Sequence, residues 1–267
     1  MNTPLIEAKA LTVRYHYKPV LWNIDCSLSA GRMIGIIGPN GSGKTTFLKT
    51  LMGLLKPDSG TVRLFGKEPK QVLERLSYVP QRESVDWDFP ARVQDVVLMG
   101  RYRRSNLLGR LSKEDRRLAD EAMDEVGLTE FAKRQIGELS GGQQQRVFLA
   151  RAIARQPELF LMDEPFAGVD AATEDAILRL LARLRDKGRS VVIVHHDLQT
   201  AQRFFDELVL LRTRLIASGP TEQVLTVEHL DEAYGGRLSV LSRMGDLLQK
   251  SQLDWKERGA NDSDHER

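Results

Sequence analysis

Short, continuous apolar runs alternate with amphipathic stretches along this chain. The runs are MIGIIG at residues 33–38, LFLMD at 159–163 and SVVIVHH at 190–196. Runs of this length are typical of strands buried on both faces of a parallel sheet. Between the last two runs, apolar residues recur at helical spacing, at Ile177, Leu180, Leu181 and Leu184. Gly188 then stands where a C-terminal helix cap belongs. The pattern predicts an α/β fold with a parallel sheet.

The stretch from about residue 91 to 155 carries no strand pattern. Within it, KEDRRLADEAMDEVG reads as an amphipathic helix that ends at Gly127. We therefore expect a helical subdomain (about 91–155) inserted into an α/β core (1–90 and 156–240), the whole forming one domain over 1–240. Residues 241–267 are a candidate helix followed by a polar tail. Leu241, Met244 and Leu248 would line one face of that helix, for which docking onto the core is favoured over a regulatory role.

Composition narrows the class of protein. With 41% hydrophobic and 28% charged residues, the 267-residue chain has the composition of a soluble globular protein. A net charge of +2 gives no argument for a nucleic-acid partner, and we expect none. The single cysteine, Cys26, cannot form an internal disulfide, which fits a reducing cytoplasm. No apolar run approaches the roughly 20 residues that span a bilayer, so we expect any membrane contact to come through another protein.

A glycine-rich motif follows the first apolar run and precedes a helix-like stretch. It matches the pattern G-x-x-x-x-G-K-[ST] and is followed by Thr46; its residues are Gly38, Pro39, Asn40, Gly41, Ser42, Gly43, Lys44 and Thr45. Glycines let backbone N–H groups surround phosphates, the lysine reaches the β and γ phosphates, and the Thr45 hydroxyl holds Mg²⁺. We name residues 38–45 the phosphate loop, and they predict a nucleoside triphosphate site.

Two carboxylates end the second apolar run. Asp163 and Glu164 come where α/β sheets place ligands, at the carboxyl end of a strand. Asp163 would bind Mg²⁺, and Glu164 would polarise the attacking water. An acid at a strand end is weak evidence alone, but together with the phosphate loop it predicts a triphosphatase.

A third motif, LSGGQ, comprises Leu139, Ser140, Gly141, Gly142 and Gln143, followed by QQRVFLARAIARQP. Locally, Ser140 can cap a helix. The pentapeptide is also the defining motif of the ATP-binding-cassette ATPases, which the sequence resembles over roughly residues 5–240. The resemblance implies a RecA-like P-loop NTPase core with an antiparallel β part near the N-terminus. It also implies that residues 140–143 meet the γ-phosphate of ATP held by the other subunit of a homodimer.

The same resemblance assigns the remaining motifs in order. Tyr15 takes the place of the aromatic that stacks on adenine, and Gln81 that of the glutamine touching Mg²⁺ and the attacking water. Asp170 falls in the loop that communicates between the two ATP sites. His196 matches the histidine that contacts the γ-phosphate, and its neighbour His195 replaces a residue that is usually small. ATP and Mg²⁺ are the cofactors implied.

Other nucleotide-binding classes fit less well. A GTPase is disfavoured because neither N-K-x-D nor T-K-x-D occurs, and the insert is too short for the coiled coil of a DNA-repair cassette. A cassette protein of the translation type would carry two copies of the cassette. The resemblance thus favours the ATPase subunit of a membrane transporter, with a soluble cassette that remodels a protein partner or a metal cluster as the alternative.

The segment YVPQRESVDWDFP sets three acids around one tryptophan, at Glu83, Asp86, Trp87 and Asp88. A metal site would be expected to offer histidine, cysteine or a compact oxygen cage. Aromatic residues alternating with acids instead favour an apolar anchor with a charged rim, which would receive a helix of the permease. With VQDVVLMGRY after it, the segment resembles that of ATPases serving manganese, zinc and iron importers; iron-siderophore or haem cargo is the alternative. The metal would be carried by the permease and delivered by an extracytoplasmic binding protein, with this chain peripheral on the cytoplasmic face of the membrane.

Overall fold

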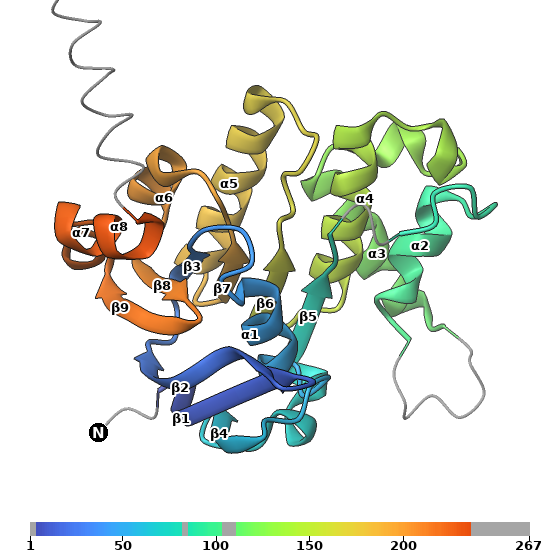
Figure 1. Cartoon of the computed structure of the whole chain (residues 1–267). Helices are drawn as coiled ribbons and strands as arrows, with labels where there is room; N and C mark the ends of the chain where they lie inside the picture. Colours follow the sequence, from blue (N-terminus) through green and yellow to red (C-terminus); the bar gives the residue numbers. More distant parts are fainter. Residues whose placement is uncertain (1–3, 82–84, 103–110, 236–267) are drawn as a thin grey trace, which may run out of the picture.

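The larger of two sheets forms the centre of the molecule (Figure 1). The computed structural model describes residues 4–81, 85–102 and 111–235. Strand order in this sheet is β5-β6-β7-β3-β8-β9. Neighbours from β5 to β8 run parallel, and β9 joins β8 antiparallel. The strands are β3 (Met33–Ile37), β5 (Leu76–Val79), β6 (Leu159–Asp163), β7 (Ser190–Val194), β8 (Glu207–Arg212) and β9 (Arg214–Pro220). The expected parallel sheet is confirmed.

Strand β3 lies inside the sheet and is buried on both faces. Met33 and Ile37 belong to one apolar cluster, while Ile34 and Ile36 belong to a second cluster on the opposite face. This division follows from the two-residue period of a strand and explains the unbroken apolar run. The predicted strand at 159–163 coincides with β6, whereas β7 ends at Val194, two residues before the predicted end.

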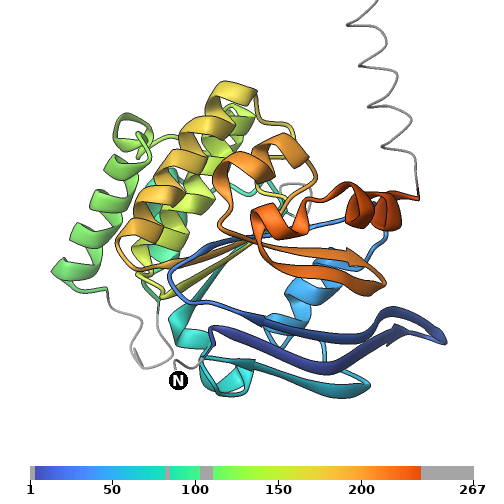
Figure 2. The same cartoon turned by 90° about the vertical axis from the view of Figure 1, so that its left-hand side faces the viewer.

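A smaller antiparallel sheet packs below the first (Figure 2). Its order is β2-β1-β4, and its strands are β1 (Ile6–Tyr15), β2 (Lys18–Leu28) and β4 (Ser59–Leu64). Helix α1 (Lys44–Leu51) contributes Phe47, Leu48 and Leu51 to the apolar cluster shared by both sheets. The antiparallel part expected near the N-terminus is therefore confirmed, and α1 is fixed from both sides.

Helices cover the opposite face of the large sheet. They are α5 (Ala171–Asp186) and α6 (Leu198–Phe204), with α7 (Thr221–Val224) and α8 (Val227–Tyr234) following β9 (Figure 1). Short 3₁₀ turns occur at Pro69–Gln71, Leu73–Arg75, Thr129–Phe131 and Ile136–Glu138. As predicted, α5 buries Ile177, Leu180, Leu181 and Leu184, and Gly188 follows it in a left-handed conformation with φ 83°. Within the described residues, no helix is long and apolar enough to cross a membrane.

Three helices between β5 and β6 lie beside the sheet: α2 (Val93–Met99), α3 (Lys113–Glu125) and α4 (Gly141–Ala154) (Figure 1). Helix α3 is the predicted amphipathic helix, and Gly127 follows it with φ 69°. One apolar cluster continues from α3 through α4 to α5 and β6. The predicted division at residues 91 and 155 therefore stays a prediction. Residues 241–267, with the candidate helix at Leu241, Met244 and Leu248, lie outside the described residues.

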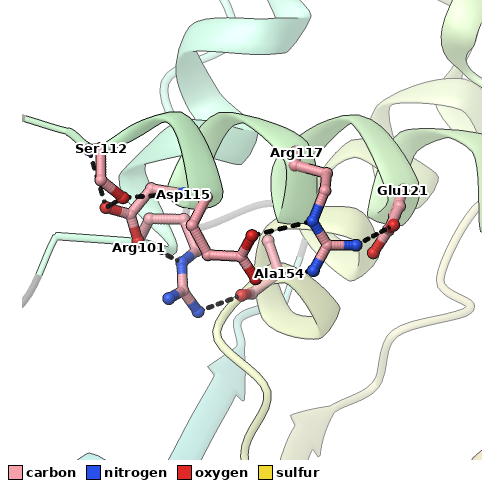
Figure 3. Close-up of polar contacts among 7 residues, drawn as sticks. Arg101, Ser112, Asp115, Arg117, Glu121 and Ala154 are labelled. Carbon is pink, nitrogen blue, oxygen red and sulfur yellow. Dashed lines mark hydrogen bonds and ion pairs between the residues drawn. The ribbon is translucent and has the colours of Figure 1, made fainter.

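A buried arginine ties these helices together (Figure 3). Arg101, which is 5% exposed, donates to Asp115 Oδ1 of α3 at 2.9 Å and to the carbonyl of Ala154 at the end of α4 at 2.7 Å. Ser112 caps α3 and donates to the Asp115 carboxylate from its backbone and its hydroxyl. Hydrogen bonds from Ser112, followed by that from Arg101, lower the pKa of Asp115 to about 2. Asp115 thus joins a helix cap to a buried cation.

Candidate functional site

The phosphate loop joins β3 to α1, and two of its glycines are required by their surroundings. Gly38 has φ 145°, and a Cβ there would lie 2.1 Å from the carbonyl oxygen of Leu211 in β8. Gly43 has φ 101° and begins α1, and its Cβ would lie 2.7 Å from the carbonyl oxygen of Val20. Since L-residues rarely adopt these conformations and no space exists for a side chain, only glycine fits. The loop backbone is therefore held close against both sheets.

Lys44 reaches back over the loop that precedes it. Its Nζ donates to the carbonyl oxygens of Gly38, at 3.0 Å, and Pro39, at 3.1 Å. Burial lowers the pKa of Lys44, while the charges of Glu164 and Asp163 raise it. The ammonium group is thus positioned over the loop, where it can exchange its carbonyl partners for the oxygens of a phosphate.

Thr45 and Asp163 meet at the carboxyl end of β6. The Thr45 hydroxyl donates to Asp163 Oδ1 at 3.0 Å, and Asp163 is only 3% exposed. Burial raises the pKa of Asp163, and the bond from Thr45 together with the charges of Lys49 and Lys44 counteracts that shift. A hydroxyl and a carboxylate side by side are hard oxygen donors, the kind that Mg²⁺ prefers. The pair therefore fits the Mg²⁺ role predicted for it.

Glu164 follows Asp163 and turns its side chain toward Gln81. Gln81 Nε2 lies 3.5 Å from Glu164 Oε2, which brings the glutamine predicted after β5 to the carboxylate predicted after β6. Glu164 has φ 44°, a left-handed conformation that costs a residue with a side chain roughly 1–2 kcal/mol. Backbone strain of this kind is concentrated at functional sites.

Of these groups, Lys44, Thr45 and Glu164 line one open hollow of about 380 Å³, whereas Asp163 and Gln81 are not among its lining residues. Its lining residues are Val20, Asn40, Gly41, Ser42, Gly43, Lys44, Thr45, Thr46 and Glu164. Val20 was not expected from the sequence, because no pattern marks a β2 residue whose contact with the loop arises only on folding. Tyr15 is not among these lining residues; it ends β1 and is 46% exposed.

The LSGGQ motif lies at the start of α4. Ser140 is exposed and caps the helix as predicted: its Oγ accepts from the Gln143 N–H at 3.4 Å, and Gln143 Oε1 accepts from the Ser140 N–H at 2.9 Å. Asp170 caps α5, accepting from the Thr173 N–H at 2.9 Å and from its hydroxyl at 2.7 Å. A Cβ on Gly142 would lie 3.1 Å from Thr173 Cγ2, so the two helix starts touch.

Apart from Tyr15, the predicted site residues thus form two groups in one chain. Between residues 4 and 235, apart from the two short gaps, no hydrogen bond joins the 140–143 segment to the phosphate loop. The first group gathers at the carboxyl ends of β3 and β6, and the second at the starts of α4 and α5.

Two adjacent histidines after β7 differ sharply in burial. His196 is exposed, whereas His195 is 2% exposed. Burial lowers the pKa of His195 to about 4, so its ring is neutral at pH 7. Of the two, the exposed His196 is the one that a ligand can reach.

The structure changes the interpretation of Trp87. We expected an anchor for another protein, but the ring is half-buried and packs edge-on against Phe148 of α4, with centroids 5.2 Å apart at 71°. Asp86 and Asp88 are exposed, and the Asp86 carboxylate accepts from the Asp88 N–H. Phe89 is 56% exposed and is the more accessible apolar group of this segment.

Only part of the segment considered as a metal site falls within the described residues. They contain no group of three or more histidine, cysteine, aspartate or glutamate side chains placed to hold a metal ion. Glu83, the third acid of the motif, lies outside them.

The motifs of this site match those of a known protein family. Residues 21–167 match the family model described as ABC transporter, a span that includes the phosphate loop, the 140–143 segment and Asp163 with Glu164. The chain belongs to the ABC transporter family. It is the ATP-binding subunit of a transporter of this family. It is an ATPase, and its hydrolysis of ATP is coupled to transport.

Curated relatives match nearly the whole chain. The manganese transport system ATP-binding protein MntB of Bacillus subtilis (strain 168) is 56% identical over 236 residues, which cover 88% of this chain and 94% of the relative. The zinc transport system ATP-binding protein TroB of Treponema pallidum (strain Nichols) is 51% identical over 234 residues, covering 88% of each.

Solved structures agree with the fold. An ABC transporter described as of the metal-chelate type, in an inward-facing conformation, superimposes with a TM-score of 0.78 at 31% identity, covering 88% of this chain and 90% of that one. An ATP-binding cassette in its ADP conformation gives a TM-score of 0.76 at 26% identity, covering 88% of this chain and 99% of that one. The expected P-loop NTPase fold is confirmed.

Proposed function

We propose that this chain hydrolyses MgATP to drive the import of a transition metal (manganese, zinc or iron) through a membrane permease. The observation that carries the metal assignment is the likeness to two relatives, at 56% and 51% identity, that are named for manganese and zinc transport. Each relative is matched over at least 88% of its own length, so the likeness extends beyond the nucleotide motifs.

ATP binding begins at the phosphate loop. Backbone N–H groups of residues 40–46, in the loop and at the start of α1, would surround the phosphates, and Lys44 would exchange its two carbonyl partners for phosphate oxygens. Tyr15 would stack on the adenine. Thr45 and Asp163 would hold Mg²⁺, with Gln81 as a further contact, and the ion would neutralise phosphate charge. The donor set supports this assignment because it consists of oxygens.

Glu164 is the proposed general base. Its carboxylate lines the hollow with the phosphate loop and lies 3.5 Å from Gln81, so a water that accepts from or donates to both side chains would be oriented toward the terminal phosphate. His196, exposed just beyond β7, would contact the same phosphate.

A second copy of the chain completes each site. Residues 140–143 make no hydrogen bond to the phosphate loop of their own chain, and Ser140, which caps α4, is exposed. In a homodimer, this helix start would meet the γ-phosphate bound by the partner, and Asp170 would lie at the same junction. ATP would thus close the dimer, and hydrolysis would reopen it.

The permease and an extracytoplasmic metal-binding protein are the proposed partners, the second acting only through the first. The chain itself would be peripheral at the cytoplasmic face of the membrane. Segment 81–90, with the exposed side chains of Asp86, Asp88 and Phe89, is the proposed contact for the permease. Nucleic acid has no part in this proposal.

Metal accumulation in cells tests the assignment. Cells lacking the gene, complemented with the wild-type chain or with Glu164→Gln, are grown with trace manganese, zinc and iron, and the cell metal content is measured by mass spectrometry. Wild type should restore one of these metals, and Glu164→Gln should not. Unchanged content of all three metals would refute the cargo, and failure to co-purify with an integral membrane protein would favour the soluble alternative.

The chain's own metal affinity is a separate measurement. Replacing Glu83, Asp86 and Asp88 by their amides should weaken binding to the permease while calorimetry with Mn²⁺ or Zn²⁺ shows negligible binding before and after. Tight stoichiometric binding that these changes abolish would restore the metal-site interpretation of the segment.

A further inference from the structure

His195, which none of the proposed roles uses, is held in an aromatic cage. Its ring meets Phe166 edge-on at 5.7 Å and Phe205 edge-on at 5.8 Å. Phe166 belongs to the loop that follows Glu164. Phe205 packs directly against Gly35 of β3, where an added Cβ would lie 2.4 Å from the Phe205 ring. The ring of His195 therefore contacts the segment that carries the proposed base, with its orientation fixed on both sides.

One edge of this ring is polar and faces a carboxylate. His195 Nε2 lies 3.5 Å from Glu174 Oε1, and in the described chain neither atom makes a well-formed hydrogen bond. A buried polar atom without a partner is costly, so a small movement that closes this gap is favourable. In the Nε2–H tautomer of the neutral ring, the completed contact is a hydrogen bond from Nε2–H to the carboxylate. Catalytic contacts are often long in nucleotide-free structures and shorten when the ligand binds.

Glu174 lies on the same helical turn as the second group of site residues. Asp170 caps α5, Thr173 touches Gly142 of the LSGGQ motif, and Glu174 is the next residue. The first turn of α5 thus contacts the start of α4 through one side chain and His195 through the next. His195 is in turn bonded to His196 along the chain, and their rings lie 5.4 Å apart.

We propose that His195 and Glu174 form a positioning pair that fixes His196 relative to the first turn of α5, and so links the two groups of the site within one chain. This inference rests on the proposed roles of His196 and of residues 140–143. Through this pair, movement of the start of α4 on meeting the partner's nucleotide would be transmitted to the side chain that contacts the chain's own nucleotide.

If His195 only filled space in the core, the polar edge of its ring would not be needed. A cage made of Phe166 and Phe205 would accept a phenylalanine at position 195 as well as a histidine, because both rings are flat and similar in size. The contact between Nε2 and a carboxylate on another element is what distinguishes the positioning role from a space-filling one.

The test compares five variants of the full chain. His195→Phe keeps the ring and removes the donor, His195→Gln restores an N–H near the Nε2 position, and Glu174→Ala removes the acceptor. The double variant His195→Phe with Glu174→Ala closes the cycle. Asp175→Asn is the matched control, on the same turn but paired with Arg179 and Arg203. Steady-state ATPase gives kcat and KM, and titration gives the ATP dissociation constant and the number of binding sites.

His195→Phe and Glu174→Ala should each lower kcat about three- to tenfold, as loss of one hydrogen bond would, with the dissociation constant changed less than about twofold. The double variant should fall no further than the singles. His195→Gln should recover most of the loss, and Asp175→Asn should stay within about twofold of wild type. Unchanged kcat in either single variant, or losses that multiply in the double variant, would overturn the pair.

Two further controls separate this inference from its premises. If His196→Ala abolishes turnover while His195→Phe does not change it, the positioning pair fails and the proposed function stands. If His196→Ala retains full turnover, the proposed role of His196 fails first. Should His195→Phe not fold, Glu174→Ala and His195→Gln decide the matter: normal kcat in Glu174→Ala would overturn the proposal, and a selective loss of kcat would support it.

Discussion

Trp87→Ala is expected to destabilise the protein as well as to impair transport. The ring is half-buried and packs edge-on against Phe148. Truncating a fully buried tryptophan costs about 3–5 kcal/mol, and an aromatic pair contributes about 0.5–1.5 kcal/mol of such a cost. At half burial we expect a loss of about 2 kcal/mol. In a domain of this size that loss lowers the melting temperature by roughly 4–8 °C.

Phe89→Ala is the matched control for Trp87→Ala. Phe89 lies two residues away but is 56% exposed, so its loss should change stability by no more than about 0.5 kcal/mol. Thermal unfolding followed by circular dichroism measures both variants, and Trp87→Phe should recover most of the lost stability because it keeps the edge contact. A difference of about 1 °C is within the error of the assay. If the Trp87→Ala protein melts that close to wild type, the packing argument is refuted.

Measuring metal uptake distinguishes the loss of internal packing from the loss of binding to the permease. If segment 81–90 contacts the permease, Phe89→Ala should reduce metal uptake in cells while leaving ATP binding and melting temperature unchanged. Normal uptake and normal co-purification with the permease in Phe89→Ala would contradict the docking role. Trp87→Ala alone cannot distinguish the two effects, because it removes internal packing from the segment that would dock.

Four further outcomes follow from the site and from the helical region. Glu164→Gln should retain ATP binding but slow hydrolysis by about 100-fold or more and trap a closed dimer; hydrolysis at the parent rate would exclude Glu164 as the base. Lys44→Ala should weaken ATP binding about ten- to a hundredfold in a titration, because a charge-assisted contact is lost. A Ser140→Arg chain mixed with a Lys44→Ala chain should form dimers with one intact site, and no more ATP bound than by Lys44→Ala alone would argue against the composite site. Since the folded-state pKa of Asp115 is about 2, its stabilising contribution is fully present above its unfolded value near 4 and is lost as pH falls toward 2; the gap in denaturation midpoints between wild type and Asp115→Asn should narrow over that range and stay constant above about pH 5.

Local patterns were sufficient to predict the central elements. The run at 159–163 coincides with β6, and Gly127 and Gly188 mark the ends of α3 and α5 because a left-handed residue terminates a helix cheaply only when it is glycine. The phosphate loop was recognisable because its glycines are required by backbone conformation, a property that sequence records directly.

Contacts between distant segments were not predictable in the same way. The burial of Trp87 depends on Phe148, a residue 61 positions later on α4. His195 and Glu174 likewise meet only because α5 returns beside β7, and each residue looks ordinary in its own segment. Sequence identified which residue types carry the chemistry, but not which neighbouring side chains hold them in place.

Because Glu164 has a left-handed backbone conformation, thermal stability and catalytic activity favour different residues at this position. Asparagine or glycine would adopt φ 44° at lower cost, so replacing Glu164 by either should make the folded chain more resistant to heat while removing the carboxylate. A laboratory selection for heat resistance alone would therefore favour inactive proteins at this position, whereas selection for transport would keep the less stable residue. In a library randomised at residue 164, the asparagine and glycine variants should rank above the parent glutamate in melting temperature and below it in turnover.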